Sequence, residues 1–221
     1  MGTLASVRVR GGDVAKARDV VRAAFSEVER LLNAHDKAAE ISSLAPLDDD
    51  QILFKCSPVV KPCYEAAFQM RDETDGVFTP RWKGSKTLDL GAIAKGFAVD
   101  LAAERLREAG LHGEILVDLG GNLKSASGEW RIALYGSEKV FVLKSGEAAA
   151  TSGEYFRGKH IRDGRTGAEC SNTLYSVTVI HPSSAMRADA LSTTLFIMGK
   201  GKGAEFLNRR HPEASAIWLR R

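Results

Sequence analysis

The segment from Leu88 to Asp100 constrains the fold more than any other part of this sequence. It reads Leu-Asp-Leu-Gly-Ala-Ile-Ala-Lys-Gly-Phe-Ala-Val-Asp, which predicts a strand end, a turn framed by Gly91 and Gly96, and a helix start carrying Lys95. Free N–H groups of a first helical turn, together with the helix dipole, favour an anion there. The segment is neither a Walker loop nor a dinucleotide fingerprint, so it predicts either a phosphate site or a well-capped turn before a packing helix.

The rest of the chain predicts helices and strands in mixed order, which favours an α+β fold. The region from Asn33 to Asp50 reads as irregular, with Asp48-Asp49-Asp50 as a solvated turn. Apolar spacing predicts helices over residues 14–32 (after Asp13), 57–74, 94–109, 187–198 and 201–208. Short apolar or alternating runs predict strands over residues 4–10, 115–117, 130–135, 139–143, 146–150, 175–180 and 214–219.

Length and composition favour a globular protein with a substantial core. We expect the 221 residues to form one domain over 1–221, with two intertwined lobes as the alternative. The 31 Lys and Arg and 28 Asp and Glu are interspersed and leave a net charge of +3, which does not favour nucleic acid as a partner.

The apolar runs and the cysteines bear on the cellular compartment. No run is long enough for a membrane span or a signal peptide, so we expect a cytoplasmic protein, or a periplasmic one if an export leader has been removed. The cysteines, Cys56, Cys63 and Cys170, form no Cys-x-x-Cys pair and predict buried thiols rather than a disulfide framework.

Three groups further along the chain carry side chains suited to phosphate or metal chemistry. Thr151 and Ser152 lie in a small polar turn that either contacts phosphate or simply ends a strand. His160 lies at a predicted strand end before a tight turn, as a proton acceptor or as a surface histidine. Asp189 and Thr193 share one helix face, where they either offer hard oxygen ligands to Mg²⁺ or act as a helix cap and a local backbone bond.

Five motifs follow one another along the chain. They are Leu-Asp-Leu-Gly-Ala-Ile-Ala-Lys-Gly, Gly-Gly-Asn, Ala-Thr-Ser-Gly, His-Ile-x-Asp-x-x-Thr-Gly and Ala-Asp-Ala-Leu-Ser-Thr. In this order they resemble the ApbE family of FAD:protein FMN transferases. The resemblance covers most of the chain and extends to Met1-Gly2-Thr3, Glu40-Ile41, Leu44 and residues 74–78.

The resemblance implies a fold, a reaction and a site. It implies an ApbE-like mixed sheet and helix architecture, binding of FAD as substrate with Mg²⁺, and transfer of FMN to a threonine of an acceptor flavoprotein subunit, with AMP released. His160 would be the catalytic base for the acceptor hydroxyl. The implied metal ligands are Asp189, Thr193 and the carbonyl of Ala92, and the implied nucleotide site contains Lys95, Asp100, Gly120, Gly121, Thr151 and Ser152.

Two segments depart from the family pattern, and both concern the flavin side of the implied site. Asn33-Ala34-His35-Asp36 stands where relatives carry Ser-x-Tyr-like residues, so His35 is left as a smaller stacking group. Only nine residues separate Phe78 from Leu88, which leaves a shortened segment near 79–88. Two alternatives to transfer therefore remain: a paralogue that binds FAD or ADP without transferase activity, and hydrolysis of the FAD pyrophosphate by water.

Overall fold

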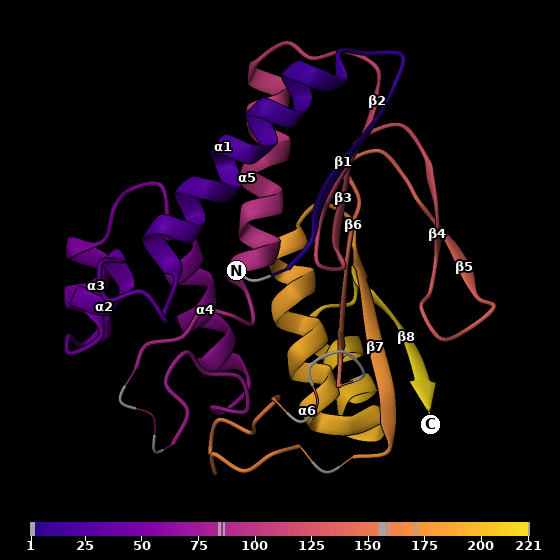
Figure 1. Ribbon diagram of the computed structural model, residues 1–221. Coiled ribbons are helices and arrows are strands. Elements are labelled where there is room, and N and C mark those ends of the chain that lie inside the picture. Colours follow the sequence, from indigo (N-terminus) through magenta and orange to yellow (C-terminus); the bar gives the residue numbers. More distant parts are fainter. Residues whose placement is uncertain are drawn as a thin grey trace.

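In the computed structural model, which describes residues 3–83, 85, 87–154, 158, 160–170 and 172–220, a six-stranded antiparallel sheet lies between two other layers (Figure 1). Met1 and Gly2, which belong to the family resemblance, lie outside the described residues. The strand order is β1-β2-β3-β6-β7-β8. The strands are β1 (Ala5–Arg10), β2 (Glu114–Leu119), β3 (Asn122–Ser127), β6 (Ala148–Gly153), β7 (Leu174–His181) and β8 (Ser215–Arg220).

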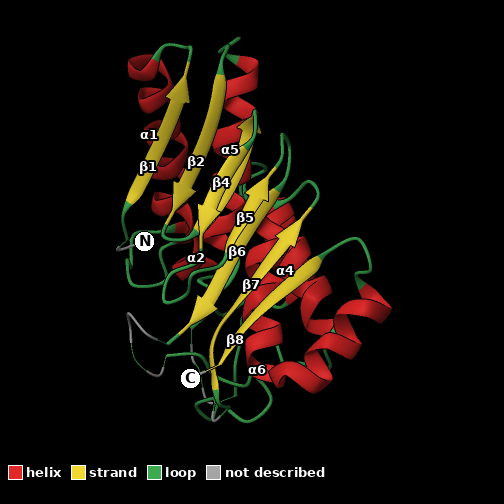
Figure 2. Ribbon diagram, turned by 90° about the vertical axis from the view of Figure 1, so that its right-hand side faces the viewer, coloured by secondary structure: helices red, strands yellow, loops and turns green. Residues whose placement is uncertain are grey.

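Helices cover one face of this sheet, and a hairpin lies over the other (Figures 1 and 2). The hairpin is a separate two-stranded sheet of β4 (Trp130–Ala133) and β5 (Val140–Leu143). The helices are α1 (Val14–Leu32), α2 (Glu40–Leu44), α3 (Asp49–Lys55), α4 (Lys61–Glu73), α5 (Ala94–Glu108) and α6 (Ala185–Arg210). Strands and helices together confirm the predicted α+β class. No helix in the described ranges is long and apolar enough to cross a membrane.

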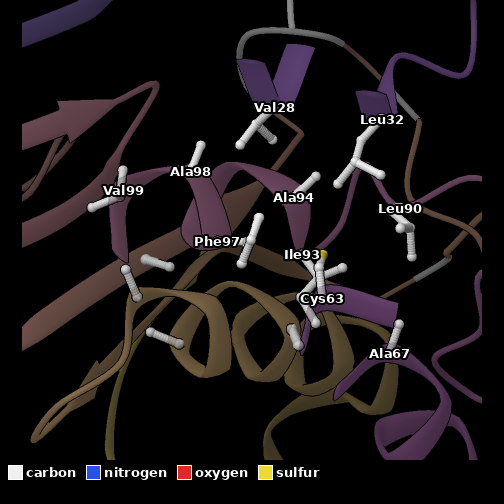
Figure 3. Packing of buried hydrophobic residues seen from close by; sticks show 14 of the residues in the cluster. Val28, Leu32, Cys63, Ala67, Leu90, Ile93, Ala94, Phe97, Ala98 and Val99 are labelled. Carbon is white, nitrogen blue, oxygen red and sulfur yellow. The ribbon is translucent and has the colours of Figure 1, made fainter. Parts of the chain in front are cut away.

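The core lies where α1, α4 and α5 meet above α6. Figure 3 shows Val28 and Leu32 of α1 facing α5, with Ile93 and Cys63 packed together below. Each fully buried aliphatic or aromatic side chain in such a cluster contributes roughly 1.5–3 kcal/mol. The described thiols are all free and buried, as the sequence predicted. A smaller cluster of Leu116, Trp130, Leu143 and Ala149 lies under the hairpin.

The beginning of helix α1 is determined by residues close to it in the sequence. The Asp13 side chain accepts a hydrogen bond from the Lys16 amide at 2.9 Å, which satisfies one of the free donors of the first turn. Residues at helical spacing, such as Val21 and Val28, are buried as predicted. Val14 was expected on the same apolar face but is 55% exposed, because it occupies the first helical position, beyond the core.

Several predicted element types or boundaries were wrong. The segment Leu88–Leu90 is no strand end, because the Leu90 carbonyl accepts the amides of Ile93 and Ala94 and closes a turn. The region from Asn33 to Asp50 contains α2 and the start of α3. Asp48 forms a capping box with Gln51, so the acidic run begins a helix. Helix α4 begins at Lys61 and is preceded by a turn at 57–60.

Two further differences concern the sheet and the last helix. Strand β3 was not predicted, because Asn-Leu-Lys-Ser-Ala-Ser lacks a strong apolar alternation, and its pairing with β2 and β6 determines its conformation. The helices predicted over 187–198 and 201–208 lie on either side of a break within α6, at Gly199 (φ 73°, ψ 168°).

Candidate functional site

A cleft of about 1490 Å³ opens where the starts of α5 and α6 meet the ends of β2 and β6. It is lined by all of the predicted site residues except Asp100: Ala92, Lys95, Gly120, Gly121, Thr151, Ser152, His160, Asp189 and Thr193. We call Lys95, Gly96, Ser152, Asp189 and Thr193 the inner end of the cleft. These residues belong to α5, β6 and α6, which are far apart in the sequence, so the fold brings together side chains that separate sequence motifs carry.

Asp189 is the buried carboxylate of the inner end. It is 3% exposed and accepts a hydrogen bond from the Gly96 amide at 3.0 Å. A side chain at Gly96 would collide with the Ala185 carbonyl oxygen, so glycine is required for α5 and α6 to approach each other here. The Gly96 amide belongs to the first turn of α5, where the sequence predicted an anion site. The anion bound to this amide is therefore the Asp189 carboxylate of the protein itself.

Lys95 adds a positive charge beside this carboxylate. Its Nζ lies 3.4 Å from Oδ2 of Asp189 and donates to the Gly91 carbonyl at 2.7 Å. The lysine side chain is 20% exposed and the aspartate side chain 4% exposed, so Lys95 is the more accessible member of the pair. A cation held in this position can meet a phosphate without moving far.

Hydroxyl groups link β6 to α6 next to Asp189. Ser152 Oγ lies 2.8 Å from Ser192 Oγ and 3.0 Å from Thr193 Oγ1. Thr151 Oγ1 lies 2.8 Å from Thr178 Oγ1. Thr151 and Ser152 were predicted in a turn, but they belong to β6, whose pairing with β7 continues to Gly153.

The helix-cap interpretation of Asp189 and Thr193 was wrong. Helix α6 begins after Ser184, whose side chain accepts the Arg187 amide at 3.1 Å, so Asp189 lies inside the helix. Thr193 contacts Ser152 across to the sheet rather than the local backbone. Both side chains line the cleft one helical turn apart, as the metal interpretation requires.

Asp100 does not line the cleft but holds the beginning of α6. Its carboxylate accepts from Ser184 Oγ at 2.8 Å, from the amides of Ala185 and Met186 at 2.9 and 3.0 Å, and from Lys124 Nζ at 2.7 Å. It thereby fixes the helix that carries Asp189. The sequence implied a nucleotide-site role, and the four donors give it a positioning role instead.

Sequence reasoning missed His181, a second group at the start of α6. Its Nδ1 accepts the amides of Ser183 and Ser184 at 3.2 and 3.0 Å, so its proton lies on Nε2, which faces Glu213 at 3.7 Å. Burial lowers the pKa of His181 below its ordinary value, although Glu213 opposes this. The run His-Pro-Ser-Ser before the helix was a signal, because it ends in a serine cap.

The β2–β3 turn forms another part of the cleft wall. Gly120 and Gly121 have φ of +61° and +86°, which other residues rarely adopt. The Gly120 amide donates to the Leu4 carbonyl and the Gly121 amide to Asp118 Oδ1. Both amides are thus used within the protein, and the turn contributes to the shape of the cleft wall rather than hydrogen-bond donors for a ligand. Asp118 was not singled out from the sequence. It lines the cleft, and burial raises its pKa despite the Gly121 hydrogen bond and nearby Arg8.

His160 is exposed and lies outside the strands, which corrects its predicted place at a strand end. Its Nδ1 lies 2.8 Å from the Gly158 carbonyl oxygen. A carbonyl oxygen only accepts, so Nδ1 carries the proton and Nε2 of the neutral ring is an acceptor. This is the protonation pattern of a potential base.

The inner end contains donors that suit Mg²⁺. Within the described ranges, no three His, Cys, Asp or Glu side chains gather into a metal cluster. The Asp189 carboxylate, the Thr193 hydroxyl and the backbone at Ala92 instead provide hard oxygen atoms along one cleft. Mg²⁺ is often held by few protein ligands, with water and substrate phosphates completing its shell, so these donors fit it.

Comparison with known proteins identifies similar sequences. Residues 81–218 match the model of the ApbE family. An FAD:protein FMN transferase of Klebsiella pneumoniae is 39% identical over 150 residues, which cover 60% of this chain and 45% of that protein. One from Vibrio cholerae is 36% identical over 135 residues, or 52% and 40% of the two chains. These alignments span less than half the length of each relative.

Solved structures show the same fold. The apo form of the Pseudomonas stutzeri flavinyl transferase ApbE covers 100% of this chain and 90% of its own, with a TM-score of 0.81 at 24% identity. The flavin transferase ApbE from Vibrio cholerae covers 99% of this chain and 90% of its own, with a TM-score of 0.79 at 22% identity. The arrangement of the sheet and helices is therefore shared with these proteins.

Proposed function

The chain belongs to the ApbE family, and from that membership we propose that it transfers FMN from FAD to a threonine hydroxyl of an acceptor flavoprotein and releases AMP. The observation that carries the proposal is the inner end of the cleft. There a buried Asp189 lies beside Lys95 and one turn from Thr193, inside a cavity large enough for a dinucleotide. The sequences named FAD:protein FMN transferase among its relatives support the same reaction.

The proposed reaction replaces the phosphoanhydride bond of FAD with a phosphoester bond to the acceptor. The acceptor threonine oxygen forms a bond to the FMN-side phosphorus, the bond from this phosphorus to the bridging oxygen breaks, and AMP leaves with that oxygen. The protein forms no covalent bond, so catalysis depends on alignment and charge. Mg²⁺ bound by Asp189, Thr193 and the Ala92 carbonyl would neutralise charge on the diphosphate.

The residues of the chain then have separate tasks. Lys95 pairs with a diphosphate oxygen, and the hydroxyls of Thr151 and Ser152 lie along the same wall. Nε2 of His160 accepts the threonine proton while Nδ1 keeps the ring oriented on Gly158. Asp100 acts from outside the cleft by fixing the start of α6.

Mass spectrometry of an acceptor protein tests the proposal. A flavoprotein domain that an active relative can modify is incubated with this protein, FAD and Mg²⁺. We expect a mass increase corresponding to FMN on the acceptor and an equal amount of AMP. Absence of both, when the relative modifies the same acceptor, would contradict the proposal. AMP without a modified acceptor would indicate FAD hydrolysis, and FAD binding without AMP would indicate a binding paralogue.

Two variants separate binding from chemistry. Asp189→Ala is expected to abolish Mg²⁺-dependent binding of FAD, whereas His160→Ala slows transfer by about 10²–10⁴-fold, the usual contribution of a positioned base, with FAD affinity retained. Equal loss of FAD affinity in both variants would contradict these separate tasks.

A further inference from the structure

The wall of the cleft also contains an aromatic group that the family resemblance did not assign. Trp82 lines the cleft, half-buried, together with His160 and Arg162. We call Trp82, His160 and residues 162–167 the outer rim. On this surface we propose that Trp82 is the wall against which the isoalloxazine ring of FAD stacks, an inference that rests on the proposed function.

The fold brings Trp82 and His160 onto the same rim although they are distant in sequence. The Lys83 amide donates to the Gly164 carbonyl at 2.9 Å, which joins the segment after Trp82 to the 163–167 turn. The Arg162 guanidinium lies over the indole, 5.6 Å from the ring centroid. In Figure 1 the two segments lie at the lower end of the molecule, away from the β4–β5 hairpin.

The position of His160 indicates which half of FAD faces Trp82. The proposed base must approach the acceptor oxygen at the FMN-side phosphorus. Because the attacking and leaving oxygens lie in line, the leaving AMP points away from the rim that carries His160, and the remaining group on this phosphorus lies nearer to that rim. The flavin is attached there, and the adenosine lies beyond the other phosphorus. An aromatic ring on this rim therefore meets the flavin rather than the adenine.

Trp82 is held as a rigid platform by the residues beside it. The guanidinium of Arg81 donates to the carbonyls of Ala45 and Leu47 at 2.5 and 2.6 Å, which ties the segment to the loop before α3. Arg162 in turn donates to the Gly167 carbonyl at 2.9 Å. The segment that carries Trp82 and the guanidinium over its ring are thus both anchored, and a side chain held in this way loses little entropy when a flat ligand stacks on it.

The other aromatic groups near the cleft are less suited to this contact. Phe78 is 3% exposed and packs in the core, while Tyr135 and Phe141 belong to the β4–β5 hairpin, a part of the cleft wall away from the lower end of the molecule in Figure 1. His35 lines the cleft but offers a smaller ring. Indole has the largest flat surface of the natural side chains, and stacking of a heteroaromatic ring on such a surface is worth about 1–3 kcal/mol.

The test compares the affinity of variants for FAD and for ADP, which lacks the flavin. Trp82→Ala is expected to weaken FAD binding by about tenfold or more, in keeping with stacking energies, and to leave ADP affinity within about twofold. Trp82→Phe should lie between the variant and the original protein. Tyr135→Ala, which removes an exposed cleft aromatic from the hairpin, is the matched control and should retain FAD affinity. The fluorescence of bound flavin should rise in Trp82→Ala, because a stacked indole quenches it.

The possible results separate this inference from the proposed function. Equal loss of FAD and ADP affinity in Trp82→Ala would show a merely structural role and overturn the inference. Unchanged FAD affinity, or a selective loss in Tyr135→Ala instead, would also overturn it while leaving the proposed function intact. If the original protein binds neither FAD nor ADP with Mg²⁺, both the proposed function and the inference fail.

Discussion

The inner end and the outer rim of the cleft are built in different ways. At the inner end, Asp189 is nearly inaccessible to solvent and is bound by an amide from α5, while its helix is fixed by Asp100. At the outer rim, His160 and Arg162 are exposed, and hydrogen bonds between loop backbones hold the segments together. Changes at the inner end must therefore disturb binding and folding together, whereas the exposed side chains of the outer rim can vary with little effect on the fold.

The largest expected effect is that of Asp189→Ala. Loss of the carboxylate removes the charged metal ligand and leaves the Gly96 amide without its acceptor. Mg²⁺-dependent FAD binding should fall by at least about 100-fold, because loss of a residue that only orients a metal ligand already costs about 10–100-fold. Calorimetric titration with and without Mg²⁺ measures this loss. Asp19→Ala, which removes an exposed carboxylate on α1, is the control and should bind normally. If Asp189→Ala bound FAD with Mg²⁺ as the original protein does, the inner end would not be the metal-binding part of the cleft that distinguishes it from the outer rim.

Gly96→Ala should produce the next largest effect, through packing alone. The added methyl would meet the Ala185 carbonyl and the Asp189 Cβ, so α5 and α6 must separate, at a cost of about 1–3 kcal/mol in the free energy of unfolding. Urea denaturation measures this cost. Gly201→Ala is the matched control because its added methyl meets nothing within 4 Å on the same α6 element. A stabilising effect at Gly96 would mean that the close approach of the helices is dispensable.

The same contrast explains what could be predicted from the sequence. Local signals determine α1, since Asp13 and the apolar spacing act within a few residues. The chemistry of Asp189, Thr193 and Lys95 left a structural role open, and the order of the motifs along the chain pointed to them as site residues; the structure places all three in one cleft. Asp100 was misplaced, since three of its four donors come from residues 84 to 86 positions away and the fourth from Lys124, and only the fold brings them together.

Trp82 was not singled out for a similar reason. Its neighbours on the outer rim lie some eighty residues further along the chain, and no local sequence pattern predicts the contact between Trp82 and Arg162. Strand β3 likewise depends on pairing partners rather than on its own apolar pattern. Distant contacts thus account for Asp100, Trp82 and β3, whereas the capping box of Asp48 and Gln51 was a local signal that the reading of the acidic run as a solvated turn overlooked.

A pH dependence of intermediate size should arise beside the inner end, at His181. Its pKa in the folded protein is lowered, so at acidic pH the unfolded chain binds more protons than the folded one. Its contribution to stability is therefore complete above the ordinary histidine pKa of about 6.5 and declines as the pH falls below that value.

Chemical denaturation between pH 7 and pH 5 measures this decline. His181→Asn is the informative variant, because its amide oxygen can accept the amides of Ser183 and Ser184 in place of Nδ1 but does not titrate. The variant should lose less stability over this range than the original protein. An identical pH profile for both proteins would show that the start of α6 does not depend on a neutral His181.

The smallest effect is expected at the outer rim, from Asp163→Asn. Asp163 lies in the 163–167 turn, and the Arg165 guanidinium, which donates to it at 2.6 Å, holds the pKa of its carboxyl below the usual range. The contribution of this pair is present above the ordinary aspartate pKa and is lost as the pH falls through the lowered value. The Arg165 side chain is 54% exposed, so water and salt screen the pair, and the substitution should cost less than about 1 kcal/mol. Urea denaturation at low and high salt measures the cost, which should diminish as salt rises. A loss as large as that of Gly96→Ala would mean that the outer rim is as tightly built as the inner end.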